Sequence, residues 1–362
     1  HSLYPFIDAT MLHESYKRLN KQSAKGVDGK TWRQYGLELA ERQEGLLAEF
    51  RAGRYKAPAI RRVYIPKDKH SRRPLGIPTI EDKVLQESVR RVLNPIYEED
   101  FKPFSYGFRS GRSQHQAIEY MFREVSYGKM HYIIDADITD FFGSINHGVL
   151  RDFLDKRVKD GVIRKMIDKW LKAGVMESGN ISYPEHGTPQ GSVISPLLSN
   201  IYLHYVLDEW FSEQIQPMLG GKSFIVRYAD DFVLGFTDKT EAERVMAVLP
   251  KRFAKYGLSL HPEKSRLIDL NDKRGGKGRS FDFLGFTHFL SKSLKGNKVL
   301  KRKTSSKRLT RSIRHVNISI RKNRHMKLRD LITAINIKLR GHYNYYGVTF
   351  NSRSLERFYR MV

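Results

Sequence analysis

The sequence contains no cysteine, which excludes disulfides, thiolate nucleophiles and zinc sites built on cysteine. Its 13 histidines are scattered without the spacing of metal ligands, so we expect no zinc-dependent nuclease domain. No run of about 18 apolar residues occurs, so the sequence predicts no membrane-spanning helix. With 362 residues, 40% of them hydrophobic, the chain is long enough for two or three globular domains that share a sizeable core.

Acidic residues are scarce relative to basic ones. The 39 aspartates and glutamates stand against 65 lysines and arginines, which leaves a net charge of +26. Such a charge attracts polyanions, so nucleic acid is the first candidate partner and an anionic membrane surface the second. No amphipathic N-terminal anchor or signal peptide is visible, which favours nucleic acid and no membrane. The imbalance is greatest in residues 301–362, where 17 lysines and arginines accompany two acids, and there we expect a basic helical module.

Two adjacent aspartates, Asp230 and Asp231, interrupt the apolar run RYADDFVLGF (227–236), which predicts a strand, a tight turn and a second strand. HYIIDADITDFF (131–142) predicts a buried strand that ends near Asp137. An Asp-Asp turn taken alone is more often ordinary turn chemistry. If the aspartates of the two segments meet across a sheet, however, their repulsion is relieved by shared divalent cations. Two Mg²⁺ ions held in this way activate a 3′-hydroxyl and stabilise a leaving pyrophosphate.

Other segments give local expectations. RRVYIPKDKHSRRPLGIP (61–78) predicts a hairpin with a highly basic turn, and residues 81–99 have helical spacing with a break at Pro95. The Gly-rich loop 105–118 ends in a capping box that opens at Ser113.

Residues 186–210 begin as a loop and then predict a helix with Ser195 as its N-cap and Pro196 at its first position. Residues 241–260 look helical, and residues 279–290 look like a further hairpin.

Ordered blocks of the chain resemble a reverse transcriptase palm: DADITDFF (135–142), GTPQGSVISPLLSN (187–200), YADD (228–231) and FLGF (283–286). The preceding IPK…RRPLGIPT and SYGFRSGRS are similar to fingers segments. KLRGHYNYYG resembles the maturase or thumb module of bacterial group II intron-encoded reverse transcriptases. The resemblance covers roughly residues 20–350. It implies an α+β right-hand polymerase: fingers and palm, an antiparallel sheet with helices, over residues 1–295, and a basic helical thumb over residues 296–362.

The resemblance also implies roles for individual residues. Asp137, Asp230 and Asp231 match the catalytic, metal-binding carboxylates, and the main-chain carbonyl of Ile138 lies near a metal in such enzymes. Phe142 matches the aromatic that closes over the sugar's 2′ position, although without the motif it reads as a plain core aromatic. Lys67, Arg73 and Gln190 match nucleotide-binding positions of the family. Lys264, in LHPEKSRL, is a separate candidate for a helper near the triphosphate. Nucleic acid contacts are expected from Arg109 and Arg112 in the Gly-rich loop, from the primer-grip residues Phe283, Leu284 and Gly285, and from Arg308, Arg311 and Arg314.

One residue departs from the family pattern. The family often has FFD where this chain has Phe141-Phe142-Gly143. Because Gly143 lies outside the trio of metal-binding aspartates, we expect a change in local loop geometry and not a loss of activity.

The function implied is RNA-directed DNA synthesis, with two Mg²⁺ ions that Mn²⁺ can replace, dNTPs, an RNA template and a DNA or RNA primer. Alternatives remain open: a splicing maturase that binds intron RNA, with polymerisation secondary, or the reverse-transcriptase part of a fusion with CRISPR adaptation proteins. An RNA-dependent RNA polymerase shares the palm chemistry, but Phe142 and the Tyr-Ala-Asp-Asp turn argue against it. We expect a cytoplasmic bacterial protein, associated with the nucleoid when bound to nucleic acid. The start at His1 suggests that the chain is part of a longer protein.

Overall fold

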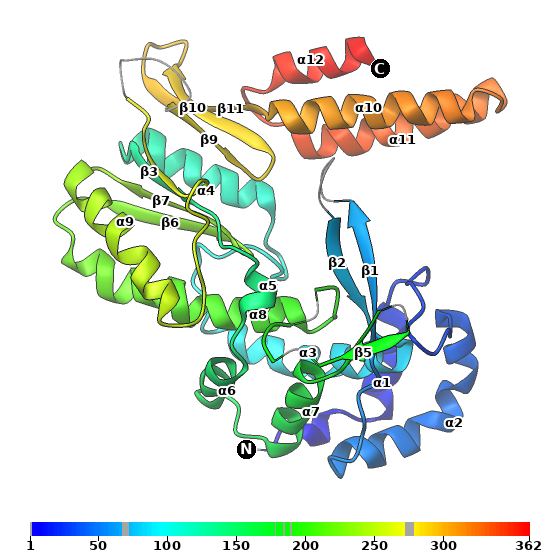
Figure 1. Cartoon of the computed structure of the whole chain (residues 1–362). Helices are drawn as coiled ribbons and strands as arrows, with labels where there is room; N and C mark the ends of the chain where they lie inside the picture. The colour runs from blue at the N-terminus through cyan, green and yellow to red at the C-terminus, as the bar shows by residue number, and fades with distance from the viewer. Residues whose placement is uncertain (1, 67–71, 178, 184, 189, 272–278) are drawn as a thin grey trace.

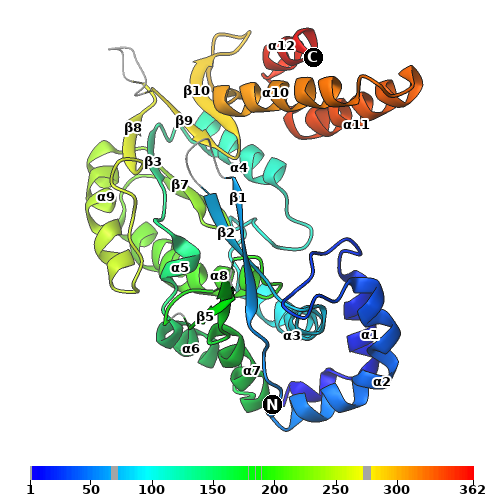
Figure 2. The same cartoon turned by 45° about the vertical axis from the view of Figure 1, so that its right-hand side comes forward.

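The computed structural model describes residues 2–66, 72–177, 179–183, 185–188, 190–271 and 279–362. Figure 1 shows three parts: a lower lobe, a middle layer built on a sheet, and a layer of helices across the top. In Figure 2, the hairpin of β1 (Ile60–Pro66) and β2 (Arg72–Ile77) rises from the lower lobe toward this top layer. None of the described helices combines the length and the apolar character that crossing a membrane requires.

The lower lobe corresponds to the expected fingers. β1 is antiparallel to β2 and parallel to β4 (Val175–Glu177). With β5 (Asn180–Ser182) these strands form a sheet of order β2-β1-β4-β5. Thr31 forms a capping box with Gln34 at the start of α2, and Thr79 caps α3, so both helix starts are fixed locally. The elements of the lobe are η1 (Tyr4–Phe6), α1 (Ala9–Arg18), α2 (Trp32–Arg51), α3 (Ile80–Glu98), α7 (Gly161–Leu171), β4 (Val175–Glu177) and β5 (Asn180–Ser182).

The middle layer is an antiparallel sheet of order β6-β7-β3-β8, the expected palm. Its alternating side chains serve two cores: Phe232 and Leu234 pack with α9 on one face, and Val233 packs toward α4 on the other. Its elements are α4 (Gln114–Tyr127), β3 (Tyr132–Ala136), α5 (Phe141–Ser144), α6 (His147–Asp155), α8 (Ser195–Leu203), η2 (His204–Asp208), η3 (Trp210–Ile215), η4 (Gln216–Met218), β6 (Ser223–Tyr228), β7 (Asp231–Phe236), α9 (Lys239–Ala254) and β8 (Arg266–Asp269).

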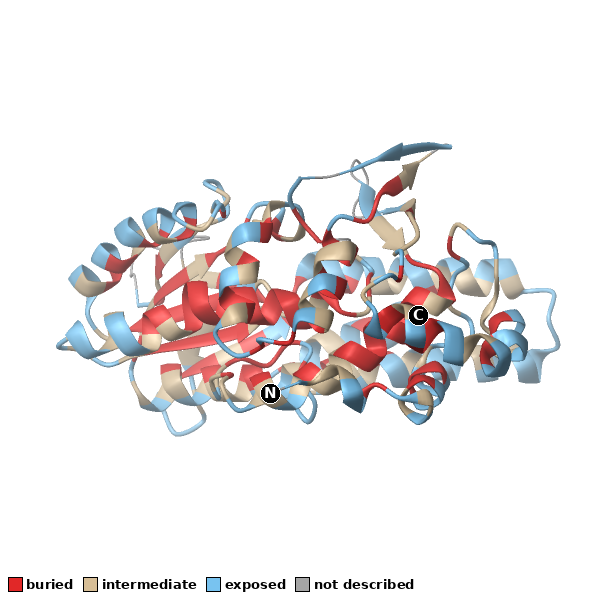
Figure 3. Cartoon of the chain, turned by 90° about the horizontal axis from the view of Figure 1, so that it is seen from below, coloured by how far each residue is buried: buried red, intermediate tan, exposed pale blue. Residues whose placement is uncertain are grey.

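A second sheet, of order β11-β10-β9, joins the palm to the top helices. Its strands are β9 (Ser280–Phe283), β10 (Phe286–Lys292) and β11 (Lys298–Thr304), and the helices are α10 (Ser306–Asn323), α11 (Leu328–Tyr346) and α12 (Ser352–Met361). Figure 3 shows that buried residues concentrate in the centre of the molecule, while the peripheral helices expose their outer faces. The top helices bury few residues, among them Leu309, Val316 and Phe358.

Most local expectations are confirmed, including the capping box of Ser113 and the hairpin over 279–290. The expected break at Pro95 is wrong: α3 continues through Pro95 to Glu98, and Tyr97 in this last part of the helix is buried in the core. Ser195 is the first residue of α8 and not its N-cap, a position that Ile194 takes.

The domain division at residue 295 stays a prediction. Residue 295 lies in the turn between β10 and β11, which pair with each other, and the helices begin at Ser306.

Candidate active site

Asp137 and Asp231 lie opposite each other where two neighbouring palm strands end. β3 and β7 run antiparallel, and the last pair of their register is Ala136 with Phe232. Continuing this register by one residue places Asp137 beside Asp231. Alternation along β3 puts Asp135 on the same face as Asp137. Three carboxylates, Asp135, Asp137 and Asp231, are therefore gathered where these two strands end. We call this end of the sheet the carboxylate edge.

Asp230 occupies the tight turn between β6 and β7, directly after Ala229, whose φ is 58°. Burial, and then the charge of Asp137, raises the pKa of Asp230. Burial and repulsion from Asp230 and Asp137 raise the pKa of Asp231 to about 6. The Asp231 side chain also keeps contact with solvent. The turn thus concentrates negative charge next to Asp137.

The segment after α9 holds Asp137 in place. The N–H of Asp137 donates to Ser265 Oγ over 3.3 Å, and its carbonyl accepts from the N–H of His261 over 2.7 Å. The backbone of Ile138 bridges to Leu260. The Lys264 ammonium lies 2.8 Å from Asp137 Oδ2, so a cation already contacts this carboxylate. The structure brings Lys264 to the carboxylates, and its expected role near a triphosphate stays a prediction.

A polar pocket of about 290 Å³ opens at this edge, lined by Asp135, Ala136, Asp137, Asp231, Phe232, Lys264, Asp282, Phe283 and Leu284. It combines carboxylates with residues of the expected primer grip. A larger cavity, of about 490 Å³, lies beside the start of α7 and contains none of the expected site residues. Its single carboxylate, Asp160, accepts hydrogen bonds from Ser2, Leu3, Tyr4, Val162 and Ile163, so it is already used within the fold.

The hairpin, the loop before α8 and the aromatic pair after β3 are tied together. The N–H of Gly76 in β2 donates to the carbonyl of Gln190 over 2.7 Å, and the N–H of Thr188 donates to the carbonyl of Phe142 over 2.8 Å. Arg73, exposed on β2, is near enough to lower the pKa values of Asp230 and Asp231 against the opposing effects. Arg73 therefore lies near the carboxylates, and the loop that carries Gln190 is joined to β2 and to the segment after β3. Lys67 lies outside the described residues.

The departure at Gly143 has a steric basis. A Cβ placed on Gly143 would come within 2.2 Å of Asp140 Oδ2, so the Asp140 carboxylate occupies the space that a side chain at position 143 needs. Asp140 has a φ of 39°, which is unusual for a residue other than glycine.

The expected primer grip is the turn between β9 and β10. Leu284 and Gly285 have φ values of 50° and 82°, as a tight hairpin requires. The hydroxyl of Tyr345 donates to the carbonyl of Leu284 over 2.8 Å, and the N–H of Ser305 donates to the carbonyl of Gly285 over 3.0 Å. The thumb thus fixes this turn beside the pocket.

The two arginines of the Gly-rich loop differ in environment. The Arg109 side chain is buried, pairs with Glu98 at 2.6 Å, and donates to the carbonyls of Lys102 and Ser105 at 2.7 Å each. Such a guanidinium has an internal role and presents no surface to a template phosphate. Arg112 is exposed, so the expected nucleic acid contact is retained for Arg112 alone.

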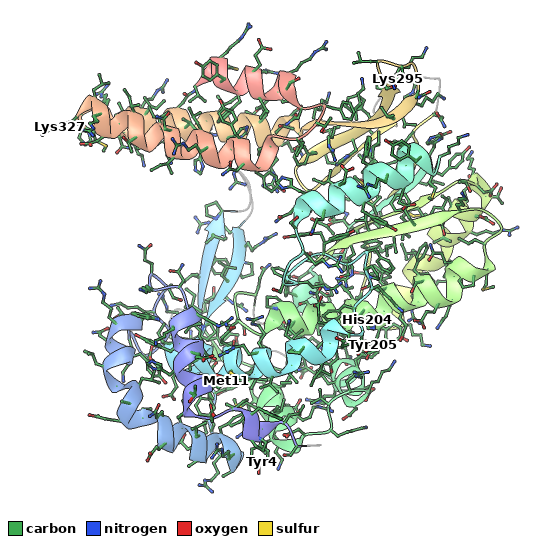
Figure 4. All side chains as sticks on the ribbon, turned by 180° about the vertical axis from the view of Figure 1, so that it is seen from behind. Tyr4, Met11, His204, Tyr205, Lys295 and Lys327 are labelled. Atoms are coloured by element: carbon green, nitrogen blue, oxygen red, sulfur yellow. The ribbon has the colours of Figure 1, made fainter. Side chains whose placement is uncertain are left out.

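Arg308, Arg311 and Arg314 are exposed on α10. Arg308 lies near enough to Asp231 to lower its pKa against the larger opposing effects, whereas the other two follow farther along the helix. Figure 4 shows long side chains projecting along the top helices, with Lys327 at the outer tip and Lys295 at the opposite end. The top layer therefore extends a basic surface outward from the carboxylate edge.

Two acids at the site were not assigned a role from the sequence. Asp135 lies on β3, two residues before Asp137, and burial raises its pKa to about 7. Asp282 reaches the pocket only because the β9–β10 hairpin folds against the palm, and its Oδ1 accepts a hydrogen bond from the Thr287 hydroxyl over 2.5 Å. The sequence around Asp282 carries no signal of this proximity.

A palm sheet that ends in carboxylates, flanked by fingers and a basic helical thumb, defines a right-hand nucleic acid polymerase. The family description "Reverse transcriptase (RNA-dependent DNA polymerase)" matches residues 65–288. The chain therefore belongs to the reverse transcriptase family.

Similar proteins agree with this assignment. Protein YkfC of Escherichia coli (strain K12) is 33% identical over 296 residues, which cover 72% of this chain and 74% of that protein. Group II intron-encoded protein LtrA of Lactococcus lactis subsp. cremoris is 36% identical over 165 residues, 45% of this chain and 27% of LtrA. The putative COX1/OXI3 intron 1 protein of Saccharomyces cerevisiae is 29% identical over 223 residues, 61% of this chain and 26% of that protein. The chain thus spans only about a quarter of these intron-encoded relatives.

The fold has a solved counterpart in a structure of telomerase from Candida albicans with a fragment of telomeric RNA. The TM-score is 0.52 at 14% identity, over 91% of this chain and 64% of the telomerase chain. At this identity the likeness concerns the fold alone, and it confirms the expected α+β right-hand architecture.

Reverse transcriptases generally use divalent metal ions, and the carboxylate edge fits such ions. No preassembled group of three metal ligands occurs among the residues that the structure describes. None is needed, because Mg²⁺ takes only one or two carboxylates besides substrate phosphates and water. Burial and the repulsion among the carboxylates raise the pKa values of Asp230 and Asp231, and a bound cation relieves this repulsion.

Proposed function

We propose that this protein extends a primer on an RNA template with deoxynucleoside triphosphates, using two Mg²⁺ ions held by Asp137, Asp230 and Asp231. The observation that carries the proposal is the register that brings Asp137 beside Asp231 and the turn of Asp230. When bound, the metal ions lower the pKa of the primer 3′-hydroxyl and offset the charge of the leaving pyrophosphate. The side chains have little covalent work to do, so positioning dominates.

In this proposal, the other residues of the site contact different parts of the substrate. Arg73 supplies positive charge toward the triphosphate, and Gln190 contacts the nucleotide from the loop that Gly76 holds. Lys67 completes this group in the proposal, on the family pattern alone. The main-chain carbonyl of Ile138 adds a neutral oxygen beside the carboxylates. The turn of Phe283, Leu284 and Gly285 supports the primer end from the far side of the pocket.

The first prediction tests the reaction itself. The protein should extend a DNA primer annealed to an RNA template when Mg²⁺ and four dNTPs are supplied, as read by product length on a gel. EDTA should abolish extension, and excess Mg²⁺ or Mn²⁺ should restore it. Extension that persists in EDTA would contradict a metal-dependent mechanism, and no product with either metal would contradict polymerisation.

A second candidate function, binding of intron RNA as a splicing maturase, is favoured by the charge of residues 301–362. In this part, 17 basic residues accompany two acids, an excess that suits a structured RNA backbone. CRISPR adaptation proteins as partners remain a prediction from the sequence.

A triple variant, in which alanine replaces Arg308, Arg311 and Arg314, tests nucleic acid binding separately from the chemical step. Each phosphate contact releases counterions, so affinity for primer–template falls by roughly one power of salt concentration per contact. We expect the triple variant to bind more weakly, with a shallower salt slope, and to extend poorly mainly at low primer–template concentration. Fluorescence anisotropy over a salt series measures the affinity and the slope.

A matched control removes the same charge from the opposite side of the palm, with alanine at Lys239, Arg244 and Lys251 on the exposed face of α9. This control should bind with nearly the wild-type slope. If both variants bind equally, only overall charge matters. If the thumb variant binds weakly yet extends normally at limiting substrate, the basic surface serves a separate RNA, as the maturase function requires.

A further inference from the structure

The turn that carries Asp230 and Asp231 is held in an unfavourable backbone conformation. Ala229 has a φ of 58°, a left-handed value that is unfavourable for a residue with a Cβ. The carboxylates at this turn also repel each other and Asp137. Both effects favour opening of the turn, so neighbouring groups must hold it closed.

The group that holds the turn is the guanidinium of Arg227. Arg227 Nη1 donates to the carbonyl of Ala229 over 2.9 Å and to Asn200 Oδ1 over 3.0 Å. Its Nε donates to Asp208 Oδ1 over 2.7 Å, and its Nη2 pairs with Asp208 Oδ2. Both charged side chains are completely buried. One edge of the guanidinium is thereby fixed by Asp208, and the next is directed at the turn.

The partners of Arg227 are anchored outside the palm sheet. Asp208 is the last residue of η2, a π-helical segment that begins at His204. Its first two residues, His204 and Tyr205, are labelled in Figure 4. Segments of this kind are often found at functional sites. Asn200, in α8, also donates through Nδ2 to the carbonyl of Gly107 over 2.7 Å.

Gly107 completes the support of the turn. A Cβ on Gly107 would come within 2.2 Å of the Ala229 nitrogen, so the loop packs directly against the turn backbone. The same loop bonds the Arg227 main chain, because the N–H of Tyr106 donates to the Arg227 carbonyl over 2.9 Å. The turn is therefore supported from the helices and from the loop at once.

Stability alone does not account for this arrangement. Replacing a buried ion pair by well-packed apolar residues is often neutral or stabilising, because desolvation offsets the attraction. An apolar pair would fill the same space but would leave the Ala229 carbonyl without its donor. What the charged cluster adds is a directed hydrogen bond to the turn.

We propose that Arg227, Asp208 and Asn200 form a positioning cluster that holds the Ala229 turn closed, so that Asp230 and Asp231 are oriented before metal and nucleotide arrive. The inference rests on the proposed metal-binding role of these two aspartates. None of the three cluster residues contacts substrate in this proposal. They act on the reaction through the carbonyl of Ala229.

The test replaces the charged pair by an apolar one, Arg227→Met with Asp208→Leu. Outer-shell groups that orient metal ligands contribute about 10–100-fold to metal affinity. We therefore expect Mn²⁺ to bind about 10–100-fold more weakly to the ternary complex with a dideoxy-terminated primer–template and dNTP, as followed by electron paramagnetic resonance. In extension assays, kcat should fall by about 100-fold, the loss that a misplacement of about 1 Å causes, while primer–template affinity stays unchanged.

Arg227→Lys gives the same test without removing charge, because lysine keeps an ion pair with Asp208 but lacks the guanidinium edge that reaches Ala229. It should also lower Mn²⁺ affinity. If the double variant does not fold, Arg227→Lys still tests the proposal. Arg164→Met is the matched control: Arg164 pairs with Asp155 in α6, away from the turn. It should leave Mn²⁺ affinity and kcat unchanged.

Wild-type Mn²⁺ affinity and kcat in a folded Arg227 variant would overturn the positioning role. Asp230→Asn tests the metal assignment separately. If Asp230→Asn is inactive while an Arg227 variant is fully active, only the positioning role of the cluster is refuted. An active Asp230→Asn refutes the assignment on which the cluster depends.

Discussion

Asp230→Asn should reduce primer extension by about 10³-fold or more while the protein remains folded. A metal ion that offsets charge in the transition state contributes several kcal/mol, and each 1.36 kcal/mol corresponds to a tenfold change in rate. Asparagine removes one of the charges that hold the metal ions, but it keeps the size of the side chain. Single-nucleotide extension at saturating Mg²⁺ and dNTP measures the loss in kcat.

The same substitution should raise the stability of the metal-free protein. Burial and Asp137 raise the pKa of Asp230 above its unfolded value, so its contribution to stability is complete at low pH and is lost as pH rises through the folded pKa. At pH 8 the wild type bears the full cost of the ionised carboxylate, and Asp230→Asn removes it. The midpoint of thermal unfolding at pH 8, in EDTA, should therefore rise above that of the wild type.

Asp152→Asn provides the matched control, because Asp152 is exposed on α6 and belongs to no part of the proposed site. It should leave extension unchanged. Extension by Asp230→Asn at a rate near the wild type would rule out the proposed metal ligands, whereas a collapsed thermal transition would indicate a structural defect.

Phe142→Ala should relax the choice between deoxynucleotides and ribonucleotides. Phe142 packs at the rim of the main core, 5.4 Å from the Phe141 ring between ring centroids, and its carbonyl is held by Thr188. A ring fixed in this way would clash with a ribose 2′-hydroxyl. We expect the ratio of kcat/KM for dNTP over rNTP to fall by about 10–200-fold, the range that steric exclusion of a small group supplies.

The readout is the ratio, because a packing defect lowers the use of both nucleotides together. Phe141→Leu is a suitable comparison: Phe141 is buried in the core beside Phe142, so this variant should lose stability and overall rate without a change in the ratio. An unchanged ratio in a folded and active Phe142→Ala would assign Phe142 to the core alone.

The sequence by itself determined the local elements that carry the candidate site. Alternating apolar residues around Ala229, Asp230 and Asp231 define the β6–β7 hairpin, and Ser113 with Gln116 defines the start of α4. These features depend on residues close in the chain, where backbone geometry and capping leave little choice. The charge of residues 301–362 indicated a polyanionic partner in the same direct way.

The tertiary structure decided which side chains remain available. Arg109 and Arg112 look alike in the sequence, yet Glu98 and three carbonyls bury the first and leave the second exposed. Burial depends on how distant segments pack, and no local pattern encodes it. The same holds for Lys264, which reaches Asp137 from 127 residues away. It holds also for the pairing of Arg227 with Asp208, because only the packing of η2 beneath β6 brings these opposite charges together out of water.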